Sequence, residues 1–273
     1  AGPAGSLAAS GRRLAASPLA VVGPGGDDAA MTRLVDLSHP VVSGEDAYPG
    51  LPAARIEPHL AHAASAAHYA GAATFEITRL FLVGNTATYL DSPFHRHPGL
   101  PDISDLPLDV LAGLPGVALD VAPDAGRAMR PRLPAGLAGH AVLLRTGWDR
   151  RRGTPAYWEP APFVPREVAN ALVDARVALV GTDTWNVDDT GDPARPAHTA
   201  LLGAGIPIVE HLRGLDRLPA RGFRFTAVPA PVRGAASMPV RAFAELAADE
   251  PPPQQPSAQR SRRATGAREA GGF

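Results

Sequence analysis

One long run of alternating apolar and polar side chains, and several compact apolar runs elsewhere, predict strands along the chain. The longest such run covers residues 74–89, in which these apolar side chains share one parity: Phe75, Ile77, Phe81 and Val83. If the chain stays extended, the same parity places further side chains on that side: Asn85, Ala87, Tyr89 and Asp91. Compact apolar runs that are typical of strands also occur at 32–37, 116–121, 141–146, 176–182, 206–209 and 223–228.

Helical spacing is scarcer than strand alternation. Residues 165–175 have apolar side chains at helical spacing behind Pro165, a residue that suits the first turn of a helix. A helical turn is predicted at 198–203, and a closing helix at 240–248. Because strands outnumber helices and do not alternate strictly with them, we expect one α/β domain with a mixed, strand-rich sheet rather than a doubly wound fold.

The two ends of the chain differ in composition from its middle. Residues 14–22 form a short apolar stretch behind two arginines, as in a signal peptide, but Ser17 and Pro18 interrupt it. Proline, glycine and small residues dominate both ends. We therefore expect a disordered extension over 1–30, a folded domain over 31–249 and a disordered tail over 250–273.

The overall composition excludes several classes of partner and site. Hydrophobic residues make up 45% of the 273 residues and charged residues 19%, as in a globular protein. A net charge of -1 provides no attraction to nucleic acid or an anionic membrane, and no apolar run approaches the ~20 residues of a membrane span. There is no cysteine, so a bound metal must use His, Asp, Glu or water. We expect a cytoplasmic protein with a small-molecule substrate.

A first candidate cluster comes directly after the longest β-like run. Asp91 and His95 lie on either side of Pro93, which fixes its own φ and biases the preceding residue toward extended geometry. A carboxylate binds cations, and an imidazole binds a metal or transfers protons near neutral pH. The alternative is that Asp91 caps a turn and His95 is a surface histidine.

A second cluster lies about a hundred residues further along and contains His198 and Glu210. Glu210 ends the apolar run 206–209, and this places its carboxylate at the rim of a pocket. The alternative is that Glu210 pairs with Arg213 and that His198 caps a helix. The residues of this cluster alone leave both interpretations open.

Taken together, these segments resemble the cyclase-like hydrolase family that includes bacterial kynurenine formamidase and isatin hydrolase. The segments that carry the resemblance are 36–40, 48–50, 143–148, 180–184 and 198–210. The resemblance implies a single domain of the swivelling β/β/α type. It also implies a homo-oligomer whose interface helps to close the pocket.

The hallmark motif of that family is His-x-Gly-Thr-His-x-Asp-x-Pro-x-His. This chain matches it at Thr88, Asp91, Pro93 and His95. Asn85 and Tyr89 stand at the positions of the two leading histidines, and Ala87 replaces the glycine. The chain therefore has a variant of the motif.

The resemblance also implies a set of metal ligands. In the formamidases, the two leading histidines and the aspartate hold one divalent metal, while the aspartate, a later histidine and a glutamate hold a second. By position, this chain keeps the second set, Asp91, His198 and Glu210, and loses two ligands of the first. One histidine, two carboxylates and water suit a single zinc or manganese ion. The last histidine of the motif, here His95, is the general acid/base of the family.

The leading prediction is hydrolysis of an amide, a formamide, or a cyclic amide or ester. As an enzyme class, we expect a hydrolase that acts on C–N bonds other than peptide bonds. A metal-activated water attacks the carbonyl, and His95 moves its proton to the leaving group. Asn85 and Tyr89 are predicted to donate hydrogen bonds to the developing oxyanion. Three aromatic residues are candidate walls of the substrate pocket: Phe94, Trp148 and Trp185.

Two other functions are compatible with the same residues. A metal-independent cyclase or dehydratase would use His95, Asp91 and Tyr89 for proton transfer, with Glu210 and His198 as an acid/base pair. A non-catalytic binding protein would keep the fold and only remnants of the site. Metal analysis separates the first function from these two.

Overall fold

The computed structural model describes residues 32–45 and 48–247. The predicted extension at 1–30 and the predicted tail at 250–273 lie outside the described residues. A nine-stranded sheet forms the centre of the domain, in the order β1 (Thr32–Asp36), β11 (Phe243–Ala247), β9 (Phe223–Thr226), β5 (Leu114–Asp120), β6 (Ala141–Arg145), β7 (Leu179–Thr182), β8 (Ile208–Glu210), β4 (Tyr89–Asp91) and β10 (Ser237–Pro239).

The sheet is mixed, as predicted. Strands β5, β6, β7 and β8 pair in parallel, and every other pairing in this sheet is antiparallel. The two helices that pack on it are α2 (Arg166–Asp174), which follows Pro165, and α3 (Pro196–Gly203). Short 3-10 helices lie in the connections: η1 (Pro93–His95), η2 (Ile103–Asp105), η3 (Leu108–Val110), η4 (Trp148–Arg151), η5 (Pro155–Trp158) and η6 (Leu215–Arg217).

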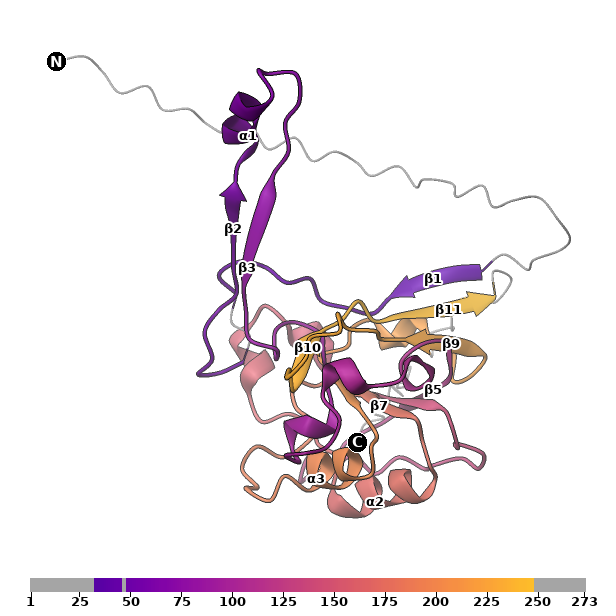
Figure 1. Cartoon of the computed structure of the whole chain (residues 1–273). Coiled ribbons are helices and arrows are strands. Elements are labelled where there is room, and N and C mark those ends of the chain that lie inside the picture. Colours follow the sequence, from indigo (N-terminus) through magenta and orange to yellow (C-terminus); the bar gives the residue numbers. More distant parts are fainter. Residues whose placement is uncertain (1–31, 46–47, 248–273) are drawn as a thin grey trace, which may run out of the picture. The chain divides into compact units, whose positions relative to one another are not determined.

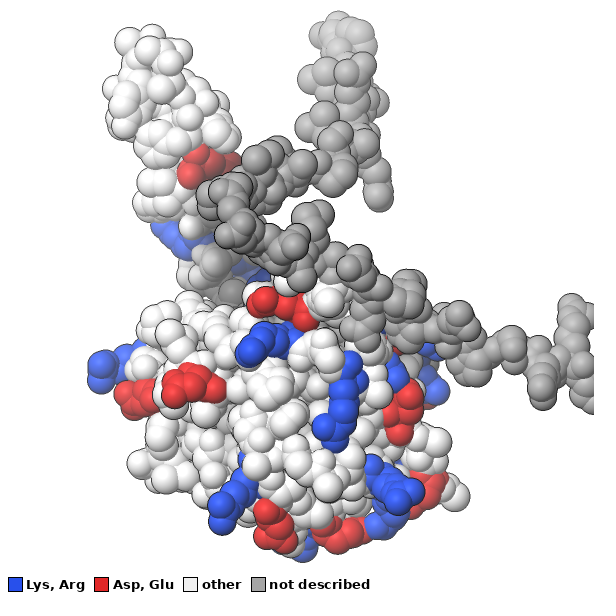
Figure 2. All heavy atoms as spheres, turned by 90° about the vertical axis from the view of Figure 1, so that its right-hand side faces the viewer, with Lys and Arg blue, Asp and Glu red and all other residues white. Residues whose placement is uncertain are grey.

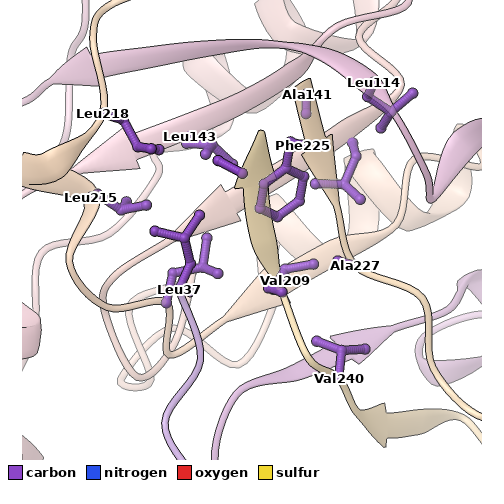
Figure 3. Packing of buried hydrophobic residues seen from close by; sticks show 14 of the residues in the cluster. Leu37, Leu114, Ala141, Leu143, Val209, Leu215, Leu218, Phe225, Ala227 and Val240 are labelled. Atoms are coloured by element: carbon purple, nitrogen blue, oxygen red, sulfur yellow. The ribbon is translucent and has the colours of Figure 1, made fainter. Parts of the chain in front are cut away.

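Alternate side chains of the central strands enter two different cores. On β6, Ala141 and Leu143 pack in one core with residues of β1, β9 and β11, while Val142 and Leu144 pack in the other with α2 and α3. Figure 3 shows the first core, where the Phe225 ring lies close to Leu143 and Val209. Helices α2 and α3 lie next to each other on the second core (Figure 1). The strand-rich sheet thus has buried apolar side chains on both faces.

The run 74–89 is not one strand, which corrects the sequence prediction. Its first part is β3 (Ile77–Phe81), which pairs with β2 (Arg55–Leu60) in a separate two-stranded sheet. Its last residue, Tyr89, begins β4 in the nine-stranded sheet. Between these two strands, residues 84–88 are not extended, and Ala87 has a φ of 57°. The alternation of β3 therefore does not continue through Asn85 and Ala87 to Tyr89.

The closing helix predicted at 240–248 is also wrong, because most of this segment is strand β11 (Phe243–Ala247). Ala244 and Leu246 are buried in the first core while their neighbours are more exposed, which is the period of a strand. The segment lies between β1 and β9 and pairs with both. A short apolar run suits either a helix or a strand, and the pairing with β1 and β9 makes this one a strand.

Strands β2 and β3 and the connecting helix α1 (His62–His68) form a hairpin arm, residues 55–81, that the sequence did not predict. Every residue of β3 is exposed. Within the arm, these large apolar side chains are exposed to solvent: Ile56, Tyr69, Phe75, Ile77, Leu80 and Phe81. Neither face of this small sheet is covered by another part of the described chain.

Charges of both signs are mixed on the surface. Figure 2 shows arginine and acidic side chains interspersed on one face rather than gathered in a patch of one sign, in line with the net charge of -1. Among the described residues, no helix has both the length and the apolar character needed to cross a membrane.

Candidate active site

Antiparallel pairing of β4 with β8 builds the inner end of the site. The register places Tyr89 opposite Glu210, and β10 on the other side of β4 places Ser237 opposite Asp91. Side chains two apart on a strand share a face, so Tyr89 and Asp91 lie on the same side as Glu210. All four residues are buried. Main-chain hydrogen bonding thus brings together three segments that are far apart in sequence.

Two histidines complete this inner end. His95 ends η1, with Nδ1 3.6 Å from Asp91 Oδ1. His198 lies in α3, with Nε2 3.5 Å from Asp91 Oδ2 and 3.7 Å from Glu210 Oε1. Possible ligand atoms of Asp91, His95 and His198 all lie within 4.8 Å of one another. The structure therefore places the four side chains from both predicted clusters around one point.

Asp188 orients His198, a role that the sequence analysis did not assign. Its Oδ2 lies 2.6 Å from His198 Nδ1, and its carboxylate also accepts hydrogen bonds from the backbone N–H groups of Ala197 and His198. With Nδ1 donating to Asp188, Nε2 points toward Asp91 and Glu210. The only sequence signal was an acidic, turn-rich loop over 188–192, which does not distinguish Asp188 from its neighbours.

The His198 ring lies among three carboxylates. Burial lowers the pKa of His198, but the hydrogen bond to Asp188, the close contact with Asp91 and the charge of Glu210 outweigh burial and raise this pKa to about 10. A proton on Nε2 therefore balances part of the negative charge at this point. A divalent cation bound there would take the place of that proton.

Asp91 has one satisfied and one unsatisfied oxygen. Oδ1 accepts hydrogen bonds from the Ser237 hydroxyl and from Asn85 Nδ2 at 3.5 Å, whereas the buried Oδ2 has no hydrogen-bond partner within the described residues. Burial by itself raises the pKa of Asp91, but the close contact with His198 and the charges of His95 and His198 hold the pKa below its usual value. The carboxylate is therefore ionised, with Oδ2 available to a ligand.

Tyr89 and Glu210 form a buried pair. The Tyr89 hydroxyl donates to Glu210 Oε2, and Glu210 Oε1 accepts the Val187 backbone N–H at 2.6 Å. Burial raises the pKa of Glu210. The charge of His198 opposes this rise and the charge of Asp91 adds to it, and the result is a pKa of about 7. Burial and both carboxylates raise the pKa of Tyr89 well above its usual value, so its oxygen keeps its hydrogen. That hydrogen is donated to Glu210, which differs from the expectation that Tyr89 donates to an oxyanion.

A cavity of about 400 Å³ opens above these residues. Its lining consists of Tyr48, Pro49, Gly50, Leu51, Asn85, Tyr89, His95, Arg96, Asn186, Arg195, His198 and Glu210. The expected aromatic walls, Phe94, Trp148 and Trp185, are absent from this lining. The indole N–H groups of the two tryptophans donate to the carbonyls of Tyr157 and Glu159, which holds them in an aromatic cluster. Trp185 packs edge-on against Tyr48, and Tyr48 faces the cavity in its place.

The inner end fits a single divalent cation. Asp91 Oδ2 is buried without a hydrogen-bond partner in the described part of the chain, next to His198 Nε2 and Glu210, and oxygen and imidazole ligands suit zinc or manganese. The group of possible ligand atoms within 4.8 Å of one another contains His95 and not Glu210, so His95 is an alternative third ligand. At the other positions of the motif, neither the Asn85 amide nor the protonated Tyr89 oxygen is a good ligand.

Comparison with known proteins assigns the chain to a family. A kynurenine formamidase from Salinibacter ruber is 35% identical over 175 residues, which is 62% of this chain and 80% of that protein. Isatin hydrolase A from Labrenzia aggregata, solved with benzyl benzoate, superposes with a TM-score of 0.66 at 24% identity over 79% of this chain and 94% of that one.

A further solved structure, described as a potential metal-dependent hydrolase with cyclase activity, has a TM-score of 0.61 at 22% identity over 79% of this chain and 98% of that one. The two structural neighbours confirm the predicted fold, a cyclase-like mixed α/β domain. The sequence profile of the cyclase family, described as "Putative cyclase", matches residues 35–189. The chain thus belongs to the cyclase family, as the resemblance in its sequence predicted.

Proposed function

We propose that the protein is a hydrolase of a non-peptide carbon–nitrogen bond and that its substrate is an aryl formamide or a related amide. The observation that carries this proposal is the position of Asp91, His95, His198 and Glu210 around one point at the inner end of the cavity. The kynurenine formamidases among its relatives support a formamide as the substrate.

The inner residues hold one divalent cation in this proposal. Asp91, His198 and Glu210 are its ligands, and Asp188 keeps the His198 ring in place through the hydrogen bond to Nδ1. When bound, zinc or manganese polarises a carbonyl oxygen and lowers the pKa of water, as in other metal-dependent hydrolases. Asp91 and Glu210 bind as carboxylates, and Tyr89 orients Glu210 through its hydroxyl.

His95 is the proton carrier of the proposed reaction. The Ser237 hydroxyl lies 3.0 Å from its Nδ1 and also donates to Asp91, which fixes the ring. Its Nε2 forms no hydrogen bond with any described residue, and the side chain lines the cavity. This nitrogen takes a proton from the attacking water and returns it to the leaving nitrogen. Asn85, also in the lining, donates a hydrogen bond to the oxyanion.

Metal quantification combined with a formamidase assay tests the proposal. Protein purified without chelator is analysed by inductively coupled plasma mass spectrometry, and formate release from N-formylkynurenine is followed with and without added zinc or manganese. We expect one metal per chain, loss of activity on chelation, and recovery with zinc or manganese. Activity that survives exhaustive chelation contradicts the metal-dependent reaction and favours the metal-independent cyclase or dehydratase. Absence of turnover over a panel of formyl and cyclic amides favours a binding protein.

We also propose that the protein is a homo-oligomer in which a second copy covers the hairpin arm. The support is the set of exposed apolar side chains on residues 55–81, among them Leu80 at 59% exposure and Ile77 at 45%. Sedimentation equilibrium of the wild type and of the Leu80→Glu variant tests this; we expect an oligomer that the substitution weakens. A monomeric wild type at micromolar concentration contradicts it. A cytoplasmic location stays a prediction.

A further inference from the structure

Two arginines at the mouth of the cavity have no carboxylate partner among the described residues. Arg96 and Arg195 both belong to the cavity lining. Across residues 32–45 and 48–247, neither guanidinium lies within 4.0 Å of a carboxylate. Elsewhere in the protein such pairs are common, as for Arg127 and Asp189 at 2.8 Å. Within the described residues neither charge forms an ion pair, although the Asp189 carboxylate, itself paired with Arg127, still interacts with the Arg195 charge at longer range.

Arg195 is held at the mouth by its backbone and by one hydrogen bond. It has φ 44° and ψ 62°, in the left-handed region that side chains other than glycine avoid, directly before α3. Its Nη1 donates to Asn186 Oδ1 at 3.2 Å. Burial raises the pKa of Tyr48, and the neighbouring Arg195 guanidinium opposes that shift. Asn186 and Tyr48 both line the cavity, so the guanidinium lies at the cavity wall.

Arg96 is anchored to the same segment of the chain. Its Nε donates to Thr199 Oγ1 and its Nη2 to the Ala194 carbonyl, both at 3.0 Å. Both acceptors are uncharged, and Nη1 has no hydrogen-bond partner in the described residues. Ala194 and Thr199 belong to the same short segment as Arg195 and His198. The Arg96 guanidinium is therefore hydrogen-bonded to the segment that carries both the other arginine and the inner histidine.

The cavity has an excess of positive charge at its mouth. Its lining contains one carboxylate, Glu210, against Arg96 and Arg195. Glu210 lies at the inner end, where its oxygens contact Tyr89, Val187 and His198. Among the described lining residues, an anion near Arg96 and Arg195 would meet two positive groups, with the one carboxylate of the lining, Glu210, at the inner end. A carboxylate is the anion whose shape matches the planar fork of a guanidinium.

We propose that the substrate carries a carboxylate group, which Arg195 and Arg96 bind at the mouth while the amide or formamide reaches His95 at the inner end. The two arginines are specificity-determining residues and take no part in bond breaking. The statement about the reacting group rests on the proposed hydrolase function. Carboxylate binding does not depend on turnover.

Matched pairs of compounds test this inference. The probes are 2-, 3- and 4-formamidobenzoate and the methyl ester of each, which keep the aryl formamide and differ in the negative charge. Formate release gives kcat and KM, and isothermal titration calorimetry gives binding whether or not turnover occurs. For at least one isomer we expect the acid to exceed its ester by about tenfold or more in kcat/KM or in affinity, the effect of a charge-assisted bidentate contact.

Variants assign the difference to the arginines. In Arg195→Gln we expect the preference for the acid to fall to about twofold or less through a higher KM or Kd, with kcat for the ester nearly unchanged. Arg195→Lys keeps the charge without the fork and should retain part of the preference. Arg96→Gln should reduce it independently. Arg221→Gln, a surface arginine outside the cavity lining, serves as the control and should behave as wild type.

The possible results separate this inference from the hydrolase proposal. Tighter binding of an acid, lost in Arg195→Gln and Arg96→Gln, supports the inference even if no formamide is hydrolysed. If the wild type has the same affinity, and the same kcat/KM where formate is released, for each acid and its ester, the inference is overturned. An Arg195→Gln variant that loses acid and ester activity equally, with an unchanged melting temperature, also overturns it, because the arginine then only supports the fold of the site.

Discussion

The inner end and the mouth of the cavity are built in different ways. At the inner end, Asp91 and Glu210 lie on paired strands, and each is no more than 1% exposed. At the mouth, Arg96 is exposed and Arg195 is half-buried, and both come from connecting segments. Main-chain pairing sets the positions of the two inner carboxylates, whereas side-chain hydrogen bonds to uncharged acceptors set those of the arginines at the mouth. The two inner carboxylates are thus fixed by the sheet, whereas the charges proposed to select the substrate lie on connecting segments.

The largest effect is expected for Asp91→Asn at the inner end. The substitution keeps the shape of the side chain but removes the ionised oxygen that faces His198 Nε2. We expect bound metal to fall to a small fraction of one per chain and kcat/KM to drop by about a thousandfold or more. Mass spectrometric metal analysis and formate release measure both. Asp120→Asn, which removes an exposed carboxylate paired with Arg145, is the control; full metal content in Asp91→Asn would refute the assigned ligand.

His95→Ala should reduce catalysis without reducing metal content. His95 has a partly exposed side chain, at 33%, and its proposed role is proton transfer. We expect kcat to fall by about 10²–10⁴-fold, while the metal content stays at the wild-type level. If the metal is lost together with activity, His95 is the third ligand rather than the proton carrier. The same metal analysis therefore decides between the two possible ligand sets.

Asp188→Asn tests whether metal binding depends on a residue that holds a ligand in place without being a ligand itself. The aspartate accepts hydrogen bonds from the His198 ring and from two backbone N–H groups, so its loss should loosen the ring. We expect metal affinity to weaken by about 10–100-fold, measured by competition with a chromogenic chelator. Asp192→Asn in the same loop changes a carboxylate whose side-chain hydrogen bond comes from the Ala194 N–H and not from His198, and it should leave affinity unchanged. Equal affinities in the two variants would show that Asp188 does not position His198.

The smallest effect is expected for Asn186→Ala, which lies between the two regions. Asn186 Oδ1 accepts from Arg195 Nη1 and from the Asp188 backbone N–H. Its loss should free the arginine and raise KM for a carboxylate substrate by about two- to fivefold, with kcat and metal content close to wild type. A large fall in kcat would mean that the mouth and the inner end are coupled through Asn186, against the separation proposed above.

Sequence reasoning found much of the sheet and most of the inner residues. Compact apolar runs such as 116–121 and 141–146 correspond to β5 and β6, and 165–175 to α2. It failed at 240–248, where a short apolar segment suits either a helix or a strand, and at 74–89, where one alternating run is shared by two sheets. It also missed Asp188 and Ser237, since their hydrogen bonds join residues that no local spacing relates.

The sequence by itself determined the chemistry that is available: no thiolate, a motif with Asn85 and Tyr89 in place of two histidines, and a histidine and a glutamate near the end of the folded part. Only the tertiary structure decided how these groups meet. The register of β4 with β8 aligns Tyr89 with Glu210, so the phenol hydroxyl donates a hydrogen bond to one oxygen of the carboxylate. The physical reason is that side-chain types follow from local sequence, whereas the partner of each strand depends on the burial of the whole sheet.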